Sequence, residues 1–168
     1  MIPLSDNVIF YDTEFSSLDP YVGEILSIGL VKLSGESLYL ELEYSGEYST
    51  WVKENILGGL NGPKVKREDA VKKIHDFIGS ERPYLVANVN CYDAVYTYKL
   101  FGIDDQPFYW LPLDFASMLF AHGMDPENYN KQEQSFFERI GVDPTRYHQH
   151  NALDDALLLR ETYLALSK

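Results

Sequence analysis

Short runs of apolar, β-branched and aromatic residues predict three strands in the first third of the chain. Val8-Ile9-Phe10-Tyr11-Asp12 has the pattern of a mostly buried strand. Residues 24–33 and 37–44 have the same character, and the Ser-Gly-Glu triplet at 34–36 between them is typical of a tight turn. These last two strands are therefore predicted to form a hairpin.

Helical and strand patterns alternate along the rest of the chain. Residues 46–65, rich in Gly, predict a loop with a short helical turn near 51–57. The further expected elements are an amphipathic helix at 67–78, a strand at 83–89, a helix at 91–101 closed by Gly102, a short strand at 111–113, a helix capped by Asp114 and running to 122, and helices at 131–140 and 151–167. An antiparallel hairpin in the first third of the chain, followed by alternating helices and strands, indicates one α/β domain over residues 1–168, with a mixed sheet flanked by helices.

The composition is that of an ordinary globular protein, with 45% hydrophobic and 24% charged residues. No run approaches the roughly 18 consecutive apolar residues that a membrane span requires. The first residues do not show the basic segment followed by an apolar run that is typical of a secretory signal. Cys91 is the only cysteine, so no internal disulfide can form, which agrees with a reducing compartment. We therefore expect a cytoplasmic protein with no membrane association.

The net charge of −12 bears directly on the kind of substrate, because 14 basic residues face 26 acidic ones. A protein that binds long nucleic acid through its phosphates usually carries a basic face. Either the substrate is not a polyanion, or it is held locally at one end while metal cations supply positive charge. The densest basic stretch is a set of candidate phosphate contacts, with a solvated helix face as the alternative: Lys64, Lys66, Arg67, Lys72 and Lys73.

Two acidic residues end the first predicted strand. Asp12 and Glu14 are two positions apart, so in an extended chain their side chains point to the same face. Acidic residues disfavour strand interiors, and two that converge repel each other unless a cation lies between them. Hard divalent ions such as Mg²⁺ and Mn²⁺ prefer such oxygen ligands. The pair is a candidate metal site, and a solvated strand end is the alternative.

Asp93 is a candidate of a different kind, since it follows a predicted buried strand and falls in the first turn of a helix. A carboxylate at this place is stabilised by the helix macrodipole, which is a sufficient structural explanation by itself. The neighbouring Cys91 has little support as a nucleophile, because a lone cysteine is more often a small buried apolar residue.

The start of the last predicted helix holds the third group of candidates. Asn151 is a good N-cap and Asp154 occupies the capping-box position, which leaves Asp155 to be explained separately. We expect Asp155 to face the same cleft as His150, a natural general base for activating water at neutral pH. A zinc site built on His148 and His150 is the rival interpretation, but zinc favours three or four His or Cys ligands.

Several familiar chemistries are absent from the sequence. It contains no G-x-S-x-G elbow, no G-x-x-x-x-G-K-[ST] phosphate loop and no G-x-G-x-x-G fingerprint. Serine hydrolases, P-loop nucleotidases and dinucleotide-dependent oxidoreductases therefore lose support.

Taken together, three motifs resemble the DEDDh family of 3′→5′ exonucleases, which includes ribonuclease T, oligoribonuclease and the proofreading subunits of DNA polymerases. They occur in the family's order and span nearly the whole chain: Phe10-Tyr11-Asp12-Thr13-Glu14-Phe15, Asn88-Val89-Asn90-Cys91-Tyr92-Asp93 and His150-Asn151-Ala152-Leu153-Asp154-Asp155-Ala156. The second motif departs from the common His-Asn-x-x-Phe-Asp pattern, because Asp93 is kept while Tyr92 replaces Phe and the polar pair is altered. The combination looks closest to a small bacterial and mycobacterial branch described as exoribonucleases.

The resemblance implies a ribonuclease H-like fold and catalysis with two Mg²⁺ or Mn²⁺ ions. In that scheme Asp12 would bridge the two ions, Glu14 and Asp155 would complete one shell, and Asp93 would support the other ion. His150 would take a proton from the attacking water. The positions implied to meet the terminal nucleotide are Phe15, Ser16, Leu18 and Tyr92, with Tyr92 and Tyr147 able to stack on bases.

The expected function is a 3′→5′ exoribonuclease that releases nucleoside 5′-monophosphates. The partner would be a nucleic-acid 3′ end, with RNA preferred over DNA through the branch resemblance alone. The alternatives are an exonuclease on single-stranded DNA, a catalytically silent domain of the same fold that binds RNA ends or a protein, and an unrelated metal-dependent phosphohydrolase acting on nucleotides. Many relatives are homodimers, so a homodimer is a further state to test.

Overall fold

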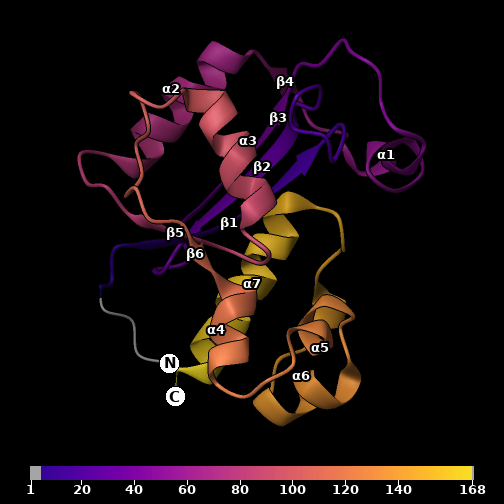
Figure 1. Ribbon diagram of the computed structural model, residues 1–168, viewed down its shortest axis with the longest axis vertical. Helices are drawn as coiled ribbons and strands as arrows, with labels where there is room; N and C mark the ends of the chain where they lie inside the picture. The colour runs from indigo at the N-terminus through magenta and orange to yellow at the C-terminus, as the bar shows by residue number, and fades with distance from the viewer. Residues whose placement is uncertain (1–4, 168) are drawn as a thin grey trace.

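A six-stranded mixed sheet in the order β4-β3-β2-β1-β5-β6 forms the centre of the computed structural model, which describes residues 5–167 (Figure 1). Its strands are β1 Val8–Phe15, β2 Ile25–Lys32, β3 Ser37–Leu42, β4 Lys64–Val65, β5 Tyr84–Ala87 and β6 Leu113–Asp114. The helices are α1 Thr50–Asn55, α2 Arg67–Ile78, α3 Cys91–Phe101, α4 Phe115–Ala121, α5 Pro126–Asn130, α6 Gln134–Ile140 and α7 Ala152–Leu166, with 3₁₀ turns at Leu57–Gly59 and Pro144–Arg146.

β1 is a central strand, antiparallel to β2 and parallel to β5. β2 and β3 form the predicted antiparallel hairpin, and Gly35 in its turn has φ 99°, a conformation that glycine adopts without strain. The pairing with β5 ends at Phe10 and Val86, whereas β1 continues alongside β2 to Phe15. The last part of β1 is thus free of β5 and open to other groups.

Alternate side chains of β1 divide the core into two layers. Ile9 and Tyr11 pack on the face covered by α2 and α3. Val8 and Phe10 pack on the opposite face with the apolar side of α7, and α4, α5 and α6 complete that layer (Figure 1). Because side chains alternate along a strand, Asp12 and Glu14 belong to the α7 face. The mixed sheet flanked by helices confirms the predicted α/β class.

Most predicted elements are confirmed, and two differ. The helix expected at 131–140 exists but begins later, as α6 at Gln134, after a turn in which Gln132 has φ 49°, and α5 was not predicted. β4 was not predicted, because its two residues are too few for a periodicity and they pair with the end of β3. Among residues 5–167, no helix is both long and apolar enough to cross a membrane.

Candidate active site

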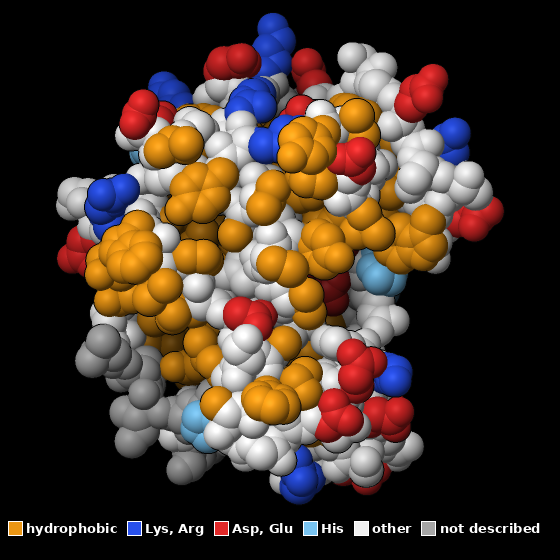
Figure 2. All heavy atoms as spheres, viewed as in Figure 1, with side chains coloured by type: hydrophobic (Ala, Val, Ile, Leu, Met, Phe, Trp, Pro, Cys, Tyr) orange, Lys and Arg blue, Asp and Glu red, His pale blue; other side chains and the backbone are white. Residues whose placement is uncertain are grey.

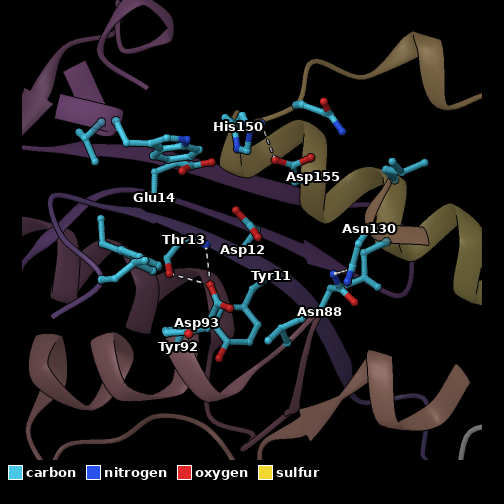
Figure 3. Close-up of a pocket in the computed structure, with 18 of the residues that line it drawn as sticks. Tyr11, Asp12, Thr13, Glu14, Asn88, Tyr92, Asp93, Asn130, His150 and Asp155 are labelled. Atoms are coloured by element: carbon cyan, nitrogen blue, oxygen red, sulfur yellow. Dashed lines mark hydrogen bonds between the residues drawn. The ribbon is translucent and has the colours of Figure 1, made fainter. Parts of the chain in front are cut away.

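Three carboxylates from β1 and α7 converge at the open end of the sheet. One oxygen from each of Asp12, Glu14 and Asp155 lies within 4.8 Å of the others. Asp12 and Glu14 point from the strand toward α7, and Asp155 reaches back from the first turn of that helix (Figure 3). The same-face geometry predicted for Asp12 and Glu14 therefore brings them to a third acidic group about 140 residues away in the chain.

Gly29 lets α7 approach the sheet closely enough to form this group. It pairs with Asp12 across β1 and β2. A Cβ atom at Gly29 would lie 2.2 Å from the carbonyl oxygen of Ala152 and 2.6 Å from the Cα of Leu153. The backbone of the first turn of α7 thus rests directly on the strand, and Asp155 follows within that turn.

Asp93 holds a different position from the other three carboxylates. It comes from α3, on the opposite face of the sheet, and its Oδ1 accepts hydrogen bonds from the backbone N–H and the hydroxyl of Thr13 at 2.9 and 2.7 Å. This contact satisfies a β1 amide beyond the point where pairing with β5 ends. Asp93 still lines the same cavity as the other carboxylates (Figure 3).

His150 lies on the loop just before α7, next to Asp155. Its backbone N–H donates to Asp155 Oδ2 at 2.9 Å, and its φ of 62° is uncommon for a non-glycine residue. Partial burial lowers the pKa of His150, so that the neutral imidazole is favoured. Asn151 caps α7 as predicted.

His148 and Asp154 belong to a separate contact outside this cavity. Asp154 Oδ2 accepts from the backbone N–H of His148 and lies 2.9 Å from its Nδ1. This bond differs from the predicted capping box, in which Asp154 would reach back to the N-cap residue. Among residues 5–167, the one cluster suited to a metal contains carboxylates and neither His nor Cys, which does not favour the zinc interpretation.

Burial gives the carboxylate group unusual proton affinities. Burial first, and then the neighbouring carboxylates, raise the pKa of Asp12 well above its ordinary value and that of Glu14 to about 8. Burial also raises the pKa of Asp155 to about 7 and that of Asp93 to about 6, although the hydrogen bonds from His150 and Thr13 oppose these two shifts. Several like charges brought out of water repel one another strongly.

A hard divalent cation fits this group, because its donors are all carboxylate oxygens and their mutual repulsion needs a positive charge. Asp12, Glu14 and Asp155 would hold such an ion together. Asp93, engaged by Thr13 and set apart from the three, is suited to a second ion or to an intervening water.

We expect the metal-free protein to lose stability as pH rises from 5 to 8. Glu14, Asp155 and Asp93 have folded-state pKa values of about 8, 7 and 6, above those of the unfolded chain. The folded state therefore binds more protons in this range, and the free energy of unfolding falls with pH. Each group held protonated by the fold costs about 1.4 kcal/mol per pH unit below its folded-state pKa, which corresponds to a drop of roughly 3–6 °C in the melting temperature per group and unit.

Thermal melts in EDTA and in excess Mg²⁺ or Mn²⁺ across this range measure the effect. The cation should remove most of the loss at pH 8. Glu54→Gln, a neutralisation of an exposed α1 carboxylate, is the control and should leave the pH dependence unchanged. A metal-free melting temperature that is flat or rises between pH 5 and 8 would contradict the prediction.

A cavity of about 770 Å³ opens in front of the carboxylates, within the range of pockets that enclose a small ligand. One part of its lining is apolar and aromatic: Phe15, Leu18, Trp51, Val89 and Tyr92. Another part carries neutral amides: Asn88, Asn130, Gln132 and Gln149. No Lys or Arg among residues 5–167 lines it. Apolar side chains cover the middle of the face in Figure 2, while most Lys and Arg side chains lie toward its edges.

Three of the four residues expected to meet the terminal nucleotide line this cavity. Leu18 and Tyr92 are 66% and 44% exposed there. Phe15 also lines it and is stacked on Tyr96, with ring centroids 4.4 Å apart. Ser16 lies behind the wall instead: it is 1% exposed, and its hydroxyl accepts a hydrogen bond from the Glu24 N–H at 3.0 Å.

Several residues around the cavity had no predicted role in the site. Trp51 lies in α1, within a segment expected to be mainly a loop, and the amides come from segments up to 61 residues apart. Val89 has φ 56°, a strained conformation for a β-branched residue, of the kind that clusters at functional sites. Gly29 was the one position that the sequence could have singled out, because a glycine inside an otherwise apolar strand often marks the close approach of another backbone.

Comparison with known proteins gives one curated relative and a set of similar folds. No family model matches the chain. A PolC-type DNA polymerase III from Thermotoga maritima is 28% identical over 178 residues, covering 96% of this chain and 12% of the polymerase. The structure is also similar to an exonuclease I, with a TM-score of 0.69, 11% identity, and coverage of 95% of this chain and 40% of that one.

A second solved structure, E. coli exonuclease I with single-stranded DNA in a zinc-bound form, has a TM-score of 0.64 and 13% identity. The alignment covers 93% of this chain and 39% of that one. The chain thus spans about an eighth of the polymerase and about two fifths of the exonuclease I chains. At these identities the structural likeness concerns the fold: the chain has the ribonuclease H-like fold of exonuclease I.

Proposed function

We propose that this chain is a metal-dependent 3′→5′ exonuclease that hydrolyses the terminal phosphodiester of single-stranded RNA. The observation that carries the proposal is the convergence of Asp12, Glu14 and Asp155 within 4.8 Å, beside Asp93 and His150, in one cavity. Single-stranded DNA is the second candidate substrate, since it accompanies the exonuclease I of similar fold and a DNA polymerase is the relative in sequence.

Each side chain has a definite task in this reaction. Asp12, Glu14 and Asp155, with Asp93, would hold two divalent cations, Mg²⁺ or Mn²⁺. When bound, the cations supply Lewis acidity that favours ionisation of water and stabilises charge on the leaving 3′ oxygen. His150, whose neutral form is favoured by its lowered pKa, would accept a proton from the attacking water. The apolar wall at Phe15, Leu18 and Tyr92 would receive the terminal base.

The test uses 5′-labelled single-stranded RNA and DNA of one sequence, with Mg²⁺, Mn²⁺ or EDTA. A ladder shortening from the 3′ end, absent in EDTA, is expected. His150→Ala should slow it by about 10²–10⁴-fold, the usual contribution of a general base. His148→Ala is the matched control, because that imidazole contacts Asp154 outside the cavity. Shortening of DNA alone would assign the second candidate. Intact RNA and DNA under every metal condition would disprove both.

Since no Lys or Arg of the described chain lines the cavity, the expected footprint on nucleic acid is small. Lys64 pairs with Glu41, and Arg67 donates to the carbonyl of Leu100 at 2.7 Å. The other cations of the basic stretch lie exposed on α2 or at its N-cap, across the sheet from α7: Lys66, Lys72 and Lys73. None of them lines the cavity. Substrate phosphates beyond the metal site would therefore meet neutral amides rather than cations.

We accordingly expect weak dependence of kcat/KM on ionic strength. Each neutralised phosphate of a single strand contributes a slope of about −0.7 to the log–log plot against salt. Neutralisation of roughly one or two phosphates by the bound metal ions predicts a slope between about −0.7 and −1.4 at constant Mg²⁺. Gln132→Lys, which adds a cation to the lining, should steepen it by about 0.7. A wild-type slope steeper than about −3 would show a long electrostatic footprint and contradict the prediction.

A further inference from the structure

The His150 imidazole lacks the usual support of a catalytic histidine. A general base is commonly oriented by a hydrogen bond from its second ring nitrogen to a carboxylate or carbonyl. Within residues 5–167, the hydrogen bond of His150 is made by its backbone N–H, and none reaches its ring. The residue is exposed and lies on a loop between Gln149 and the N-cap Asn151. Any restriction on the orientation of the His150 ring must therefore come from packing rather than from a hydrogen bond.

The ring of Trp51 provides the contact that the His150 ring otherwise lacks. The two ring centroids are 5.0 Å apart and the planes meet at 85°, an edge-to-face arrangement. This geometry is the favoured one for aromatic pairs, because the positive edge of one ring meets the negative face of the other. Both rings line the same cavity, although 99 residues separate them in the chain.

The backbone of Trp51 is firmly anchored, so its ring is a fixed support. Ser49 caps α1 by accepting from the Val52 N–H at 3.2 Å, and its own N–H donates to the carbonyl of Ser16 at 3.3 Å, just beyond β1. Val52 is 3% exposed and packs in a small core with Leu26. The indole itself is 52% exposed. α1 therefore ties Trp51 to the same segment that carries Asp12 and Glu14.

We propose that Trp51 is a positioning residue that holds the imidazole of His150 toward the carboxylate group. The inference rests on the proposed function, since it assigns a support to the general base of that reaction. Trp51 acts through His150 and takes no part in proton transfer itself. An aromatic pair of this kind favours the held orientation by about tenfold, so removal of the indole should slow catalysis while leaving the binding of the substrate intact.

Steady-state kinetics on a short 5′-labelled single strand test the proposal. Trp51→Ala should lower kcat about tenfold and change KM by less than about threefold, and Trp51→Phe should restore kcat to within about threefold. In a His150→Ala background, Trp51→Ala should lower kcat by less than twofold, because the residue it supports is gone. Tyr92→Ala is the matched control, an exposed aromatic of the same cavity whose effect should persist in both backgrounds.

Three results would overturn the proposal. One is a rise in KM with unchanged kcat for Trp51→Ala, which would make the indole a platform for a base. Another is a full tenfold loss in the His150→Ala background. The third comes from NMR of the His150 ring protons, which should be shifted by the indole in the wild type and move in Trp51→Ala; identical shifts would exclude the contact. This last readout needs no activity, so it separates failure of the positioning role from failure of the proposed function.

Discussion

Asp12→Asn is expected to lower the exonuclease rate by at least about 10³-fold and to raise the melting temperature of the metal-free protein. The substitution removes one anionic ligand from three whose oxygens lie within 4.8 Å. Metal ions stabilise the transition state by several kcal/mol, and each 1.4 kcal/mol is a factor of about ten in rate. The pKa of the Asp12 carboxyl is raised by burial and by Asp93, Asp155 and Glu14. Replacing this carboxyl with a neutral amide therefore relieves repulsion in the metal-free protein.

A lower rate together with a higher metal-free melting temperature would show that the Asp12 carboxylate supports catalysis but destabilises the fold. The measurements are the rate of 3′ shortening in Mg²⁺ and thermal melts in EDTA at pH 8. Asp154→Asn is the matched control on α7, because that carboxylate contacts His148 rather than the cluster. It should stay within a few-fold of the wild-type rate. Wild-type activity of Asp12→Asn, or a lower melting temperature in EDTA, would refute the assignment of Asp12.

Gly29→Val is expected to destabilise the protein and to separate the two halves of the site. The added Cβ would meet the carbonyl oxygen and carbon of Ala152 at 2.2 and 2.5 Å. These are backbone atoms, so no side-chain rotation relieves the overlap and α7 must move. Overpacking of this kind costs about 1–3 kcal/mol or more, equivalent to roughly 3–10 °C in melting temperature. A displacement of about 1 Å at a catalytic group can cost 10²-fold in rate.

The readouts for Gly29→Val are the melting temperature and kcat/KM on the same labelled strand. Gly58→Ala is the matched control, because a Cβ there meets nothing within 4 Å. That variant should leave both quantities unchanged. Since β2 carries no ligand, a loss of activity in folded Gly29→Val would come from the shift of Asp155 and His150. A stable and fully active variant would contradict the close approach of α7.

Local chemistry was sufficient to predict most elements of the fold. The helix at 67–78 was predicted with the bounds of α2, because apolar residues recur on one face of an amphipathic helix. Asp114 and Asn151 cap α4 and α7 as expected, and Gly102 ends α3 with φ 81°. These signals act within one or two turns of chain and do not depend on distant residues.

The elements that were missed depend on contacts between segments. β4 exists through its pairing with Glu41 and Leu42 of β3. The break between α5 and α6 places Gln132 in the left-handed region and turns its side chain to the cavity. Neither a two-residue strand nor one residue with positive φ leaves a periodic trace in the sequence.

The sequence by itself determined the chemistry of the candidate site: an Asp-x-Glu pair on one face of a strand, and a His and an Asp at the start of the last helix. Tertiary structure decided how these groups meet. It placed α7 on Gly29, engaged Asp93 with Thr13, and set Trp51 against His150. It also left the cavity without Lys or Arg among residues 5–167. The reason is physical, since spacing along a chain specifies direction within an element, whereas distances between elements are set by packing.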